Sequence, residues 1–498
     1  MRDLFLSIDA GGTAVKAAVF DAEGRLVALK AIDIVTLHRP NGWVEREAEP
    51  FWQKTARAIR ELTATEVPAE RIAVVGCTGF GNGVFLVDGE GRATRDGIVS
   101  VDHRAQPLVD AMVRDGTAAG IEAVTGQQVW GGQTVMQLVW LARNEPGIVR
   151  RTRFALSCKD FLRMRLTGVA ATEPTDASGG GLFDLEKGGY DAALFQRLGI
   201  PEFFERMPPV VENSAVAGSV SRMAAAETGL VEGTPVVAGM MDVGACVLGS
   251  GALGNGALTM IAGTWSINAV EHAGKVEGRP PILNMLHRDR ACRLLATGSP
   301  TSAGNLTWYL SHAAGGSVTF DEANELVAAS AVDGRRCHFL PYVNGPHPRR
   351  GAFVGLVNSD DRGSMLRAIY EGVAFQHRRH GEEVTAYLAP RRPGVIRLAG
   401  GASKSRAWTQ IFADVCGLPV EVCEGDEIGA LGTAICASVA AGVHPDLPAA
   451  VRAMCRVTRS SEPDPARRAF YEDRYREFLT VDKTLAGLFE EPERQAPQ

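Results

Sequence analysis

Apolar residues in the first thirty positions form short runs separated by a turn. The runs at 4–9 and 14–20 predict two strands. Glycine in the turn at 21–24 can adopt a positive φ, which allows a third strand at 25–29 to pair back antiparallel. We therefore expect the chain to open with two β-hairpins.

The pattern then alternates between helical and strand-like spacing. Apolar residues recur every three or four positions through 50–63, and a buried strand at 72–76 follows. Strand, helix and strand in this order predict an α/β domain with a mixed sheet. Further elements expected in the first half are helices at 135–142 and 161–166 and two loops rich in glycine or serine, at 77–83 and 175–181.

Near the middle of the chain the opening pattern recurs. An apolar run from residue 234 ends in Asp242, and 258–267 repeats the order strand, Gly-Thr, strand. Gly263 lies 251 positions after Gly12, which is about half of the 498 residues. Two related halves are therefore a hypothesis, although one short match is weak support for a duplication.

A third glycine turn lies late in the chain. A strand at 395–399 is followed by glycines at 400 and 401 and by a helix at 405–416. Strand, glycine turn and helix in this order let a backbone lie close to a nucleotide.

Composition narrows the class of protein. A chain of 498 residues suggests two to four domains. The 52 basic and 58 acidic residues nearly balance and form no dense Lys/Arg block, so we expect no nucleic-acid partner. The nine cysteines are scattered singly with no C-x-x-C pair, which favours a reducing compartment over a disulfide framework or a zinc site.

Membrane association is not expected either. The longest uncharged and mostly apolar stretch, 428–443, has 16 residues, fewer than the roughly 18–20 needed to span a bilayer. Asp3 and Asp9 leave the N-terminal apolar run too short for a signal peptide. We therefore expect a cytoplasmic protein.

The turn after the first strand carries candidate chemistry. Asp9 ends the strand, and Gly11, Gly12 and Thr13 follow it. The carboxylate can hold Mg²⁺, while turn amides and the threonine hydroxyl can face phosphate oxygens. A plain hairpin turn can carry the same residues. Few folds, however, need three glycine turns together with two strand-end acids, so the combination favours a binding site. Neither a G-x-G-x-x-G nor a G-x-x-x-x-G-K-[ST] motif occurs at these positions, which counts against Rossmann and P-loop folds.

In order along the chain, these motifs resemble the FGGY family of carbohydrate kinases, of the actin/hexokinase/Hsp70-like fold. The first phosphate motif at 9–13 with Lys16, a G-W-V-E loop at 42–45 and the segment of the catalytic acid at 239–242 are all similar to that family. Further similar segments are 132–141, 263–264, 351–356, 367–372, 400–403 and 429–434, the last two being like its adenosine region. Gln137 and Ser364 depart from the family's usual residues.

This resemblance implies an α/β fold of two ribonuclease-H-like domains around a central cleft. The domains would be 1–246, with the sugar site and first phosphate motif, and 247–490, with the second phosphate motif and adenosine site. The polar tail at 491–498 would be disordered. A homodimer is left open.

The resemblance also implies phosphoryl transfer from ATP with Mg²⁺ to a hydroxyl of a small sugar or polyol. Asp242 would be the catalytic proton acceptor, and Asp9 would serve the metal. The residues expected to bind ATP are Gly11, Gly12, Thr13, Lys16, Gly263, Thr264, Gly304, Gly401 and Ser405. Plain structural interpretations are also open for three side chains: a helix cap for Asp242, a solvated hairpin lysine for Lys16, and a helix start or core packing for Ser405.

Substrate choice would lie with Phe80, Asn82, Asp102, Arg104 and Asp242. An asparagine between glycines is equally typical of a turn, and a surface ion pair is the alternative for Asp102 and Arg104. Glycerol kinases carry an aromatic residue in place of Gly132, which favours a larger pocket here. The stretch 299–308 resembles the corresponding stretch of L-xylulose kinases, so a pentulose such as L-xylulose is the first expected substrate. The loop at 79–83 resembles that of erythritol kinases, so erythritol or another tetritol or pentitol is the second. A non-catalytic sugar-binding regulator on the same scaffold is the remaining alternative.

Overall fold

The computed structural model describes residues 2–254, 256–316, 318–330, 332, 337–345 and 349–489. The expected tail at 491–498 lies outside these residues. By internal contacts the chain forms two compact units. Unit 1 comprises residues 1–253, 271–295 and 427–456, and unit 2 comprises 254–270, 296–426 and 457–498. Residues 271–295 and 427–456 therefore belong to the same unit as the N-terminal residues, although they lie beyond the domain boundary predicted at residue 246.

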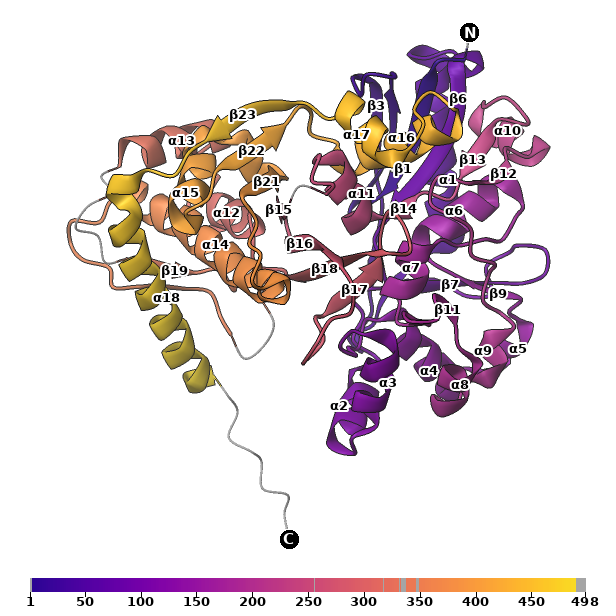
Figure 1. Cartoon of the computed structure of the whole chain (residues 1–498), viewed down its shortest axis with the longest axis horizontal. Helices are drawn as coiled ribbons and strands as arrows, with labels where there is room; N and C mark the ends of the chain where they lie inside the picture. Colours follow the sequence, from indigo (N-terminus) through magenta and orange to yellow (C-terminus); the bar gives the residue numbers. More distant parts are fainter. Residues whose placement is uncertain are drawn as a thin grey trace. The chain divides into compact units, whose positions relative to one another are not determined.

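A mixed sheet forms the centre of unit 1 (Figure 1). Its order is β12-β13-β6-β1-β2-β3, and β14 pairs with β6 beyond β13. The strands are β1 (Leu4–Ala10), β2 (Ala14–Phe20), β3 (Leu26–Asp33), β6 (Ile72–Gly79), β12 (Val216–Ser219), β13 (Pro235–Val237) and β14 (Met240–Met241).

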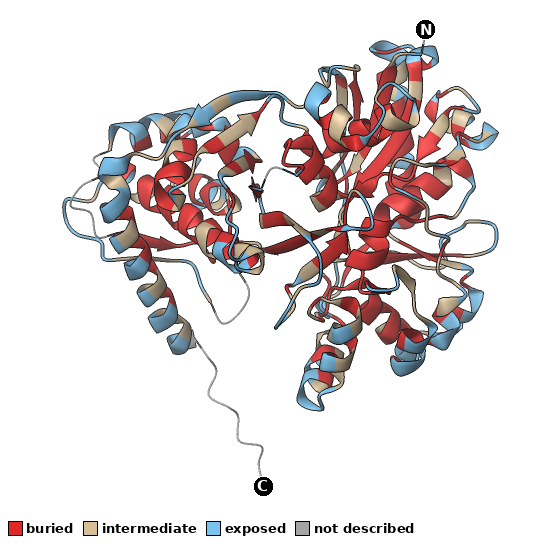
Figure 2. Cartoon of the chain, viewed as in Figure 1, coloured by how far each residue is buried: buried red, intermediate tan, exposed pale blue. Residues whose placement is uncertain are grey.

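Side-chain alternation along β1 separates two apolar cores. Leu4, Leu6 and Ile8 point into a core with α1 (Ala48–Thr65), α6 (Cys158–Thr167) and α10 (Arg222–Thr228). Phe5 points into a second core with α11 (Asp242–Gly249), α16 (Ile428–Ala440) and α17 (Leu447–Met454). Helices thus cover both faces of the sheet, and its central strands β1 and β6 are buried, whereas the edge strands β3 and β12 are partly exposed (Figure 2).

The remaining part of unit 1 contains a five-stranded sheet of order β4-β5-β8-β7-β9 and a third apolar core. Its strands are β4 (Leu37–His38), β5 (Val44–Arg46), β7 (Gly83–Val87), β8 (Gly97–Val99) and β9 (Phe154–Leu156), and a small hairpin joins β10 (Phe183–Asp184) to β11 (Gly189–Tyr190). The other helices of this unit are η1 (Ala69–Arg71), α2 (Gln106–Arg114), α3 (Thr117–Thr125), α4 (Thr134–Asn144), α5 (Pro146–Arg151), α7 (Pro174–Gly179), α8 (Ala192–Arg197) and α9 (Pro201–Phe204).

The second large sheet has the order β17-β18-β16-β15-β21-β22-β23. Its strands are β15 (Ala257–Ala262), β16 (Ser266–Ala273), β17 (Leu283–Leu286), β18 (Cys292–Ser299), β21 (Val395–Ala399), β22 (Val420–Cys423) and β23 (Val457–Ser461), and β19 (His338–Leu340) pairs with β20 (Ala352–Val354). The helices of unit 2 are α12 (Gly304–Trp308), η2 (Tyr309–Ala313), α13 (Phe320–Ala329), α14 (Arg362–Thr385), η3 (Ala386–Leu388), η4 (Gly401–Lys404), α15 (Arg406–Cys416), η5 (Pro465–Arg467) and α18 (Arg468–Phe489).

The same strand arrangement occurs once in each unit. β1 is antiparallel to β2 and parallel to β6, and β15 is antiparallel to β16 and parallel to β21. The expected α/β fold with mixed sheets and two glycine-turn hairpins is confirmed.

Two local predictions are wrong. The loop at 175–181 contains α7, because Glu173 caps the amides of Thr175 and Asp176 and starts a helix. The loop at 77–83 is shorter than expected, because β6 continues to Gly79 and β7 begins at Gly83. The antiparallel strand expected at 25–29 is confirmed, and it extends to Asp33 along the whole of β2. Among the described residues, no helix combines the length and the hydrophobicity that a membrane span requires.

Candidate active site

Two acidic residues lie at the carboxyl ends of two strands that flank β6 in unit 1. β1 and β14 both run parallel to β6, where Ala10 and Met241 are each in register with Gly79. Asp9 precedes Ala10, and Asp242 follows Met241 as the first residue of α11. The carboxyl ends of parallel strands are where α/β sheets bind ligands, because the chain leaves the sheet there.

Alternation decides which way Asp9 points. Asp9 shares the face of Phe5, which is the side of α16, and a Cβ added to Gly429 on α16 would lie 3.5 Å from its Oδ2. Lys16 stands opposite Asp9 on β2 and donates to Glu427 at 2.7 Å. The lysine is therefore an ion-pair partner in this structure and not a solvated hairpin residue.

These charges shift the protonation of both acids. Loss of water around Asp9 raises its pKa to about 6; the charge of Lys16 opposes this shift and that of Glu427 adds to it. Loss of water and then the charge of Asp9 raise the pKa of Asp242 to about 7, against hydrogen bonds from the amides of Val243 and Gly81. A carboxylate with a pKa near neutrality can accept a proton more readily than an ordinary aspartate.

The backbone before Asp242 is held on two sides. Thr78 on β6 donates its hydroxyl to the carbonyl of Met240 at 2.8 Å. The amide of Met241 donates to the hydroxyl of Thr175 at 2.8 Å, and that hydroxyl donates to Glu173 at 2.7 Å. The last strand residues before the acid are thereby fixed by side chains from β6 and α7.

In the first glycine turn the carbonyls of Gly11 and Gly12 are already bound, and the amide of Gly11 donates to the Ala14 carbonyl at 3.0 Å. Arg46, a buried residue at the end of β5, donates to the carbonyl of Gly11 at 3.2 Å and to that of Gly12 at 2.7 Å. Gly12 and Thr13 are exposed. The turn can therefore offer N–H groups and a hydroxyl to an anion.

The second glycine turn gathers the other predicted nucleotide residues in unit 2. Gly263 and Thr264 connect β15 to β16, and a Cβ on Gly304 would lie 3.4 Å from the Thr264 methyl carbon. A Cβ on Gly400 would lie 2.8 Å from Ala262, and one on Gly401 3.9 Å from its carbonyl. These residues thus lie together where β15 and β21 end.

Ser405 and the segment 429–434, both predicted to lie near the nucleotide, have structural contacts of their own. The hydroxyl of Ser405 accepts the amide of Trp408 and caps α15, as its helix-start interpretation requires. The segment 429–434, which resembles the adenosine region in sequence, lies on α16 in unit 1 beside Asp9.

Phe80 and Asn82 follow the carboxyl end of β6, and the amide of Gly81 between them hydrogen-bonds to Asp242. Phe80 donates its amide to the Ala10 carbonyl at 3.1 Å, and its ring lies under the guanidinium of Arg46. Asn82 has φ 58° and accepts the amide of Thr134 at the start of α4 through Oδ1. The positive φ of Asn82 fits the turn interpretation. Its Nδ2 has no protein partner among the described residues, so the sugar-binding interpretation also stands.

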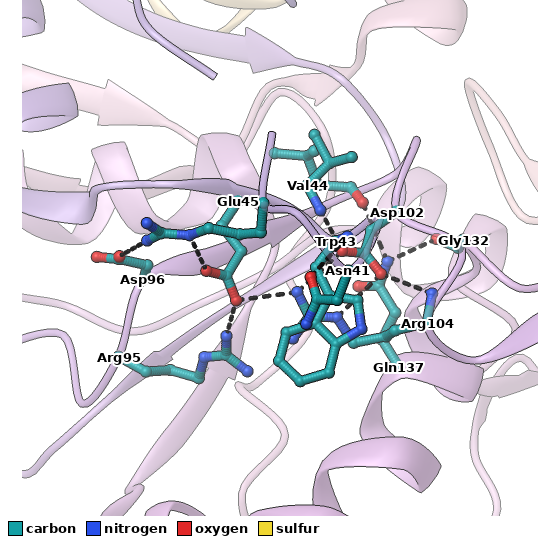
Figure 3. A network of polar contacts seen from close by, with 12 residues as sticks. Asn41, Trp43, Val44, Glu45, Arg95, Asp96, Asp102, Arg104, Gly132 and Gln137 are labelled. Carbon is teal, nitrogen blue, oxygen red and sulfur yellow. Dashed lines mark hydrogen bonds and ion pairs between the residues drawn. The ribbon is translucent and has the colours of Figure 1, made fainter. Parts of the chain in front are cut away.

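Asp102 and Arg104 form a buried ion pair, not one at the surface. Arg104 donates to both carboxylate oxygens of Asp102 at 2.9 Å and to Glu45 at 2.9 Å (Figure 3). Asp102 also accepts the amide of Val44. The guanidinium lies over the ring of Trp43 at 4.2 Å. The pair therefore joins the loop after β8 to β5, and a role in sugar binding remains a prediction.

The expectation of a larger pocket at Gly132 is not supported by its packing. A Cβ at this position would lie 1.9 Å from the carbonyl of Ser100 and 2.3 Å from the ring of Trp130. The space that a side chain at 132 would need is thus filled by other residues, and glycine is required because the backbone passes so close.

Three site residues were missed by sequence reasoning: Arg46, Thr175 and Glu427. Arg46 directly follows the G-W-V-E loop, which was a local signal. Thr175 sat in a segment interpreted as a loop, and Glu427 is 411 positions from Lys16. No periodicity links such distant residues.

Known proteins resemble this chain along most of its length. Residues 4–249 match the model of the FGGY family of carbohydrate kinases, N-terminal domain, and residues 258–441 match its C-terminal domain. An L-xylulose/3-keto-L-gulonate kinase of Escherichia coli is 32% identical and aligns over 98% of each chain. An erythritol kinase of Brucella abortus is 28% identical over 98% of this chain and 97% of its own.

A solved structure supports the fold. The ligand-bound xylulose kinase of Lactobacillus acidophilus superposes with a TM-score of 0.88 at 21% identity, covering 97% of this chain and 98% of that one. At this level of identity the likeness concerns the fold alone.

Proposed function

Because this chain belongs to the FGGY family of carbohydrate kinases, we propose that it transfers the γ-phosphoryl group of ATP to a hydroxyl of a pentulose, with L-xylulose as the preferred acceptor. The observation that carries the site assignment is the pair Asp9 and Asp242 at the ends of β1 and β14. Asp242, with its pKa near 7, is the proton acceptor.

The protein promotes the reaction mainly by positioning the sugar hydroxyl and the phosphates. The sugar hydroxyl donates a hydrogen bond to Asp242, which takes the proton as the hydroxyl oxygen forms its bond to the γ-phosphorus. The bond between that phosphorus and the β–γ bridging oxygen breaks, and ADP leaves. The amides of Gly12 and Thr13 bind phosphate oxygens, while the amide of Gly11 closes the turn on the Ala14 carbonyl. In unit 2, Gly263, Thr264, Gly304 and Gly401 bind the nucleotide.

The acidic residues at the strand ends suit a hard divalent cation. The charge of Glu427 acts on Asp9, and that of Asp9 acts on Asp242, while Lys16 forms an ion pair with Glu427. Oxygen ligands and an excess of negative charge fit Mg²⁺, with Asp9 as the residue that holds it. When bound, Mg²⁺ neutralises charge on the phosphates.

Substitution of Asp242 tests the role of the base. Asp242→Asn should lower kcat/KM by about 10²–10⁴, because the amide cannot accept the hydroxyl proton, while ATP still binds. Coupled ADP release and calorimetric ATP titration measure the two effects. Asp446→Asn, at the exposed N-cap of α17, is the matched control and should keep wild-type turnover. Turnover near wild type in Asp242→Asn would contradict the assignment.

The acceptor is identified by a screen of L-xylulose, D-xylulose, erythritol and pentitols at equal concentration. We expect the highest kcat/KM with L-xylulose, in line with the relative of that specificity. A higher value with erythritol would replace the proposed acceptor and leave the kinase assignment intact. Phosphorylation of none of them would overturn the proposal as a whole.

A further inference from the structure

Three potential metal ligands of different chemistry converge in unit 1 on residues that phosphoryl transfer does not use. Glu271 lies on β16, His287 follows β17, and Cys292 begins β18. One ligand atom of each residue lies within 4.8 Å of the others. His287 and Cys292 are buried, and Glu271 is largely buried.

Both ring nitrogens of His287 face oxygen atoms. The Nε2 atom lies 3.1 Å from the carbonyl oxygen of Gly244, which can only accept a hydrogen bond, and Nδ1 lies 3.0 Å from Oε1 of Glu271. A neutral imidazole has a single N–H, and when Gly244 accepts it the Nδ1 lone pair is available to a metal ion beside the carboxylate. With a proton on Nδ1 the same contact is an ordinary ion pair.

The surroundings resemble those of metal sites in proteins. A ligating histidine usually donates its second ring N–H to a carbonyl or carboxylate, as His287 does to Gly244. The turn between His287 and Cys292 is closed by Asp289, which accepts the amides of Ala291 and Cys292. The spacing between the two ligands is thereby set by the backbone.

Arg288 is the group that competes with a metal ion. Its Nε lies 3.2 Å from Glu271, and its Nη1 lies 2.7 Å from Asp289. Because Arg288 is already bound to Asp289 and is partly exposed, it can leave Glu271 without losing its other carboxylate partner. Metal binding must then draw the three ligand atoms to separations of roughly 3.3–3.8 Å, as tetrahedral Zn²⁺ requires.

We propose that Glu271, His287 and Cys292 form a binding site for a thiophilic divalent cation of the Zn²⁺ type, with one coordination position left for water. Nitrogen, sulfur and carboxylate oxygen are the donors that Zn²⁺ accepts, whereas Mg²⁺ prefers oxygen alone. The site joins β16, β18 and, through His287 and Gly244, the first turn of α11. Its occupancy should stabilise unit 1 against unfolding.

Cobalt provides the test, because Co²⁺ occupies zinc sites and absorbs light. The full chain, stripped with EDTA and titrated with Co²⁺ alone, should show a near-ultraviolet thiolate-to-cobalt band that Zn²⁺ removes and Mg²⁺ does not. Cys292→Ser should abolish the band. Cys246→Ser is the matched control, because Cys246 lies beside Asp9, where Co²⁺ could bind in place of Mg²⁺, and this variant should keep the band.

Glu271→Gln is a second variant that decides the matter if Cys292→Ser does not fold. It keeps the side-chain shape but removes the charge, so it should weaken Co²⁺ binding by at least about tenfold. Absence of the band in the wild-type chain would mean that a proton alone lies between His287 and Glu271 and would overturn the proposal. A band that persists in Cys292→Ser, or one that depends on Cys246, would overturn it equally.

Discussion

Gly239 shows at the residue scale how the catalytic acid is placed. It separates β13 from β14 with a φ of 78°, and a Cβ there would lie 1.9 Å from the carbonyl oxygen of Cys77 on β6. Only glycine permits both the left-handed conformation and this approach. The close approach lets β14 continue along β6 after the break and delivers Asp242 to the strand end.

Gly239→Ala should therefore destabilise unit 1 strongly. Gly233 has a similar φ of 83° but no atom within 4 Å of an added Cβ, so Gly233→Ala isolates the conformational cost of about 1–2 kcal/mol. Gly239→Ala adds a backbone overlap and should lower the free energy of unfolding by about 3–5 kcal/mol. Urea denaturation measures both, and equal losses in the two variants would refute the role of the close approach.

At the scale of elements, α6 and α7 hold β14 through a buried charge cluster. Lys159 on α6 lies within ion-pair distance of Asp160, Glu173 and Asp176, all buried. Glu173 orients the hydroxyl of Thr175, which accepts the amide of Met241. A buried cation with three carboxylates keeps its geometry because separation of any partner would leave a charge without compensation.

Thr175→Val should reduce turnover without changing ATP binding. The variant leaves the buried Met241 amide without an acceptor, a cost of about 1–3 kcal/mol, and frees the strand that carries Asp242. We expect kcat to fall about tenfold to hundredfold with the KM for ATP unchanged, and Thr175→Ser to restore it.

Thr55→Val is the control for that experiment. Thr55 is also a buried threonine, but its hydroxyl donates to Phe51 within α1 and touches no residue of β14. Steady-state kinetics should show wild-type kcat in this variant. If Thr55→Val and Thr175→Val lose turnover equally, general loss of packing and not strand positioning is the cause.

At the scale of the whole molecule, three buried histidines give unit 2 a dependence on pH. Burial, followed by the charge of Arg474, lowers the pKa of His338 to about 4, and burial with Arg379 lowers that of His380 to about 4. Burial also lowers the pKa of His377, whose ring hydrogen-bonds to Asn268 and Ser302. All three lie in unit 2.

The stability of unit 2 should fall as the pH drops from about 6.5 to 4. In this range the unfolded chain takes up protons on these histidines while the folded unit does not, so protonation favours unfolding. Above pH 6.5 the histidines are neutral in both the folded and the unfolded chain, so they do not change stability. Each unit of pKa difference between the two states changes the free energy of unfolding by about 1.4 kcal/mol. Calorimetric melting temperatures across this range measure the effect.

His380→Gln should flatten that pH dependence, whereas His103→Gln, at an exposed position of unit 1, should leave it unchanged. A melting temperature of unit 2 that does not vary between pH 6.5 and 4 would contradict the prediction.

The amino-acid sequence by itself determined the local parts of the site. Strand-end acids, Gly-Thr turns and the helix after Ser405 depend on neighbouring residues and on side-chain periodicity, so they could be predicted and were found where expected. The family followed from the order of these motifs. Errors arose where a cap or a close backbone contact overrides local pattern, as with Glu173 and with Gly132.

Only the tertiary structure decided which distant groups surround the acids. Glu427 reaches Lys16 across 411 positions, and Thr175 reaches Met241 because α7 packs against β14. Glu271, His287 and Cys292 have no metal-binding spacing in the sequence, and they converge because β16, β17 and β18 are neighbours in one sheet. Long-range packing, not sequence distance, sets such contacts, because folding brings remote segments together to bury their shared apolar faces.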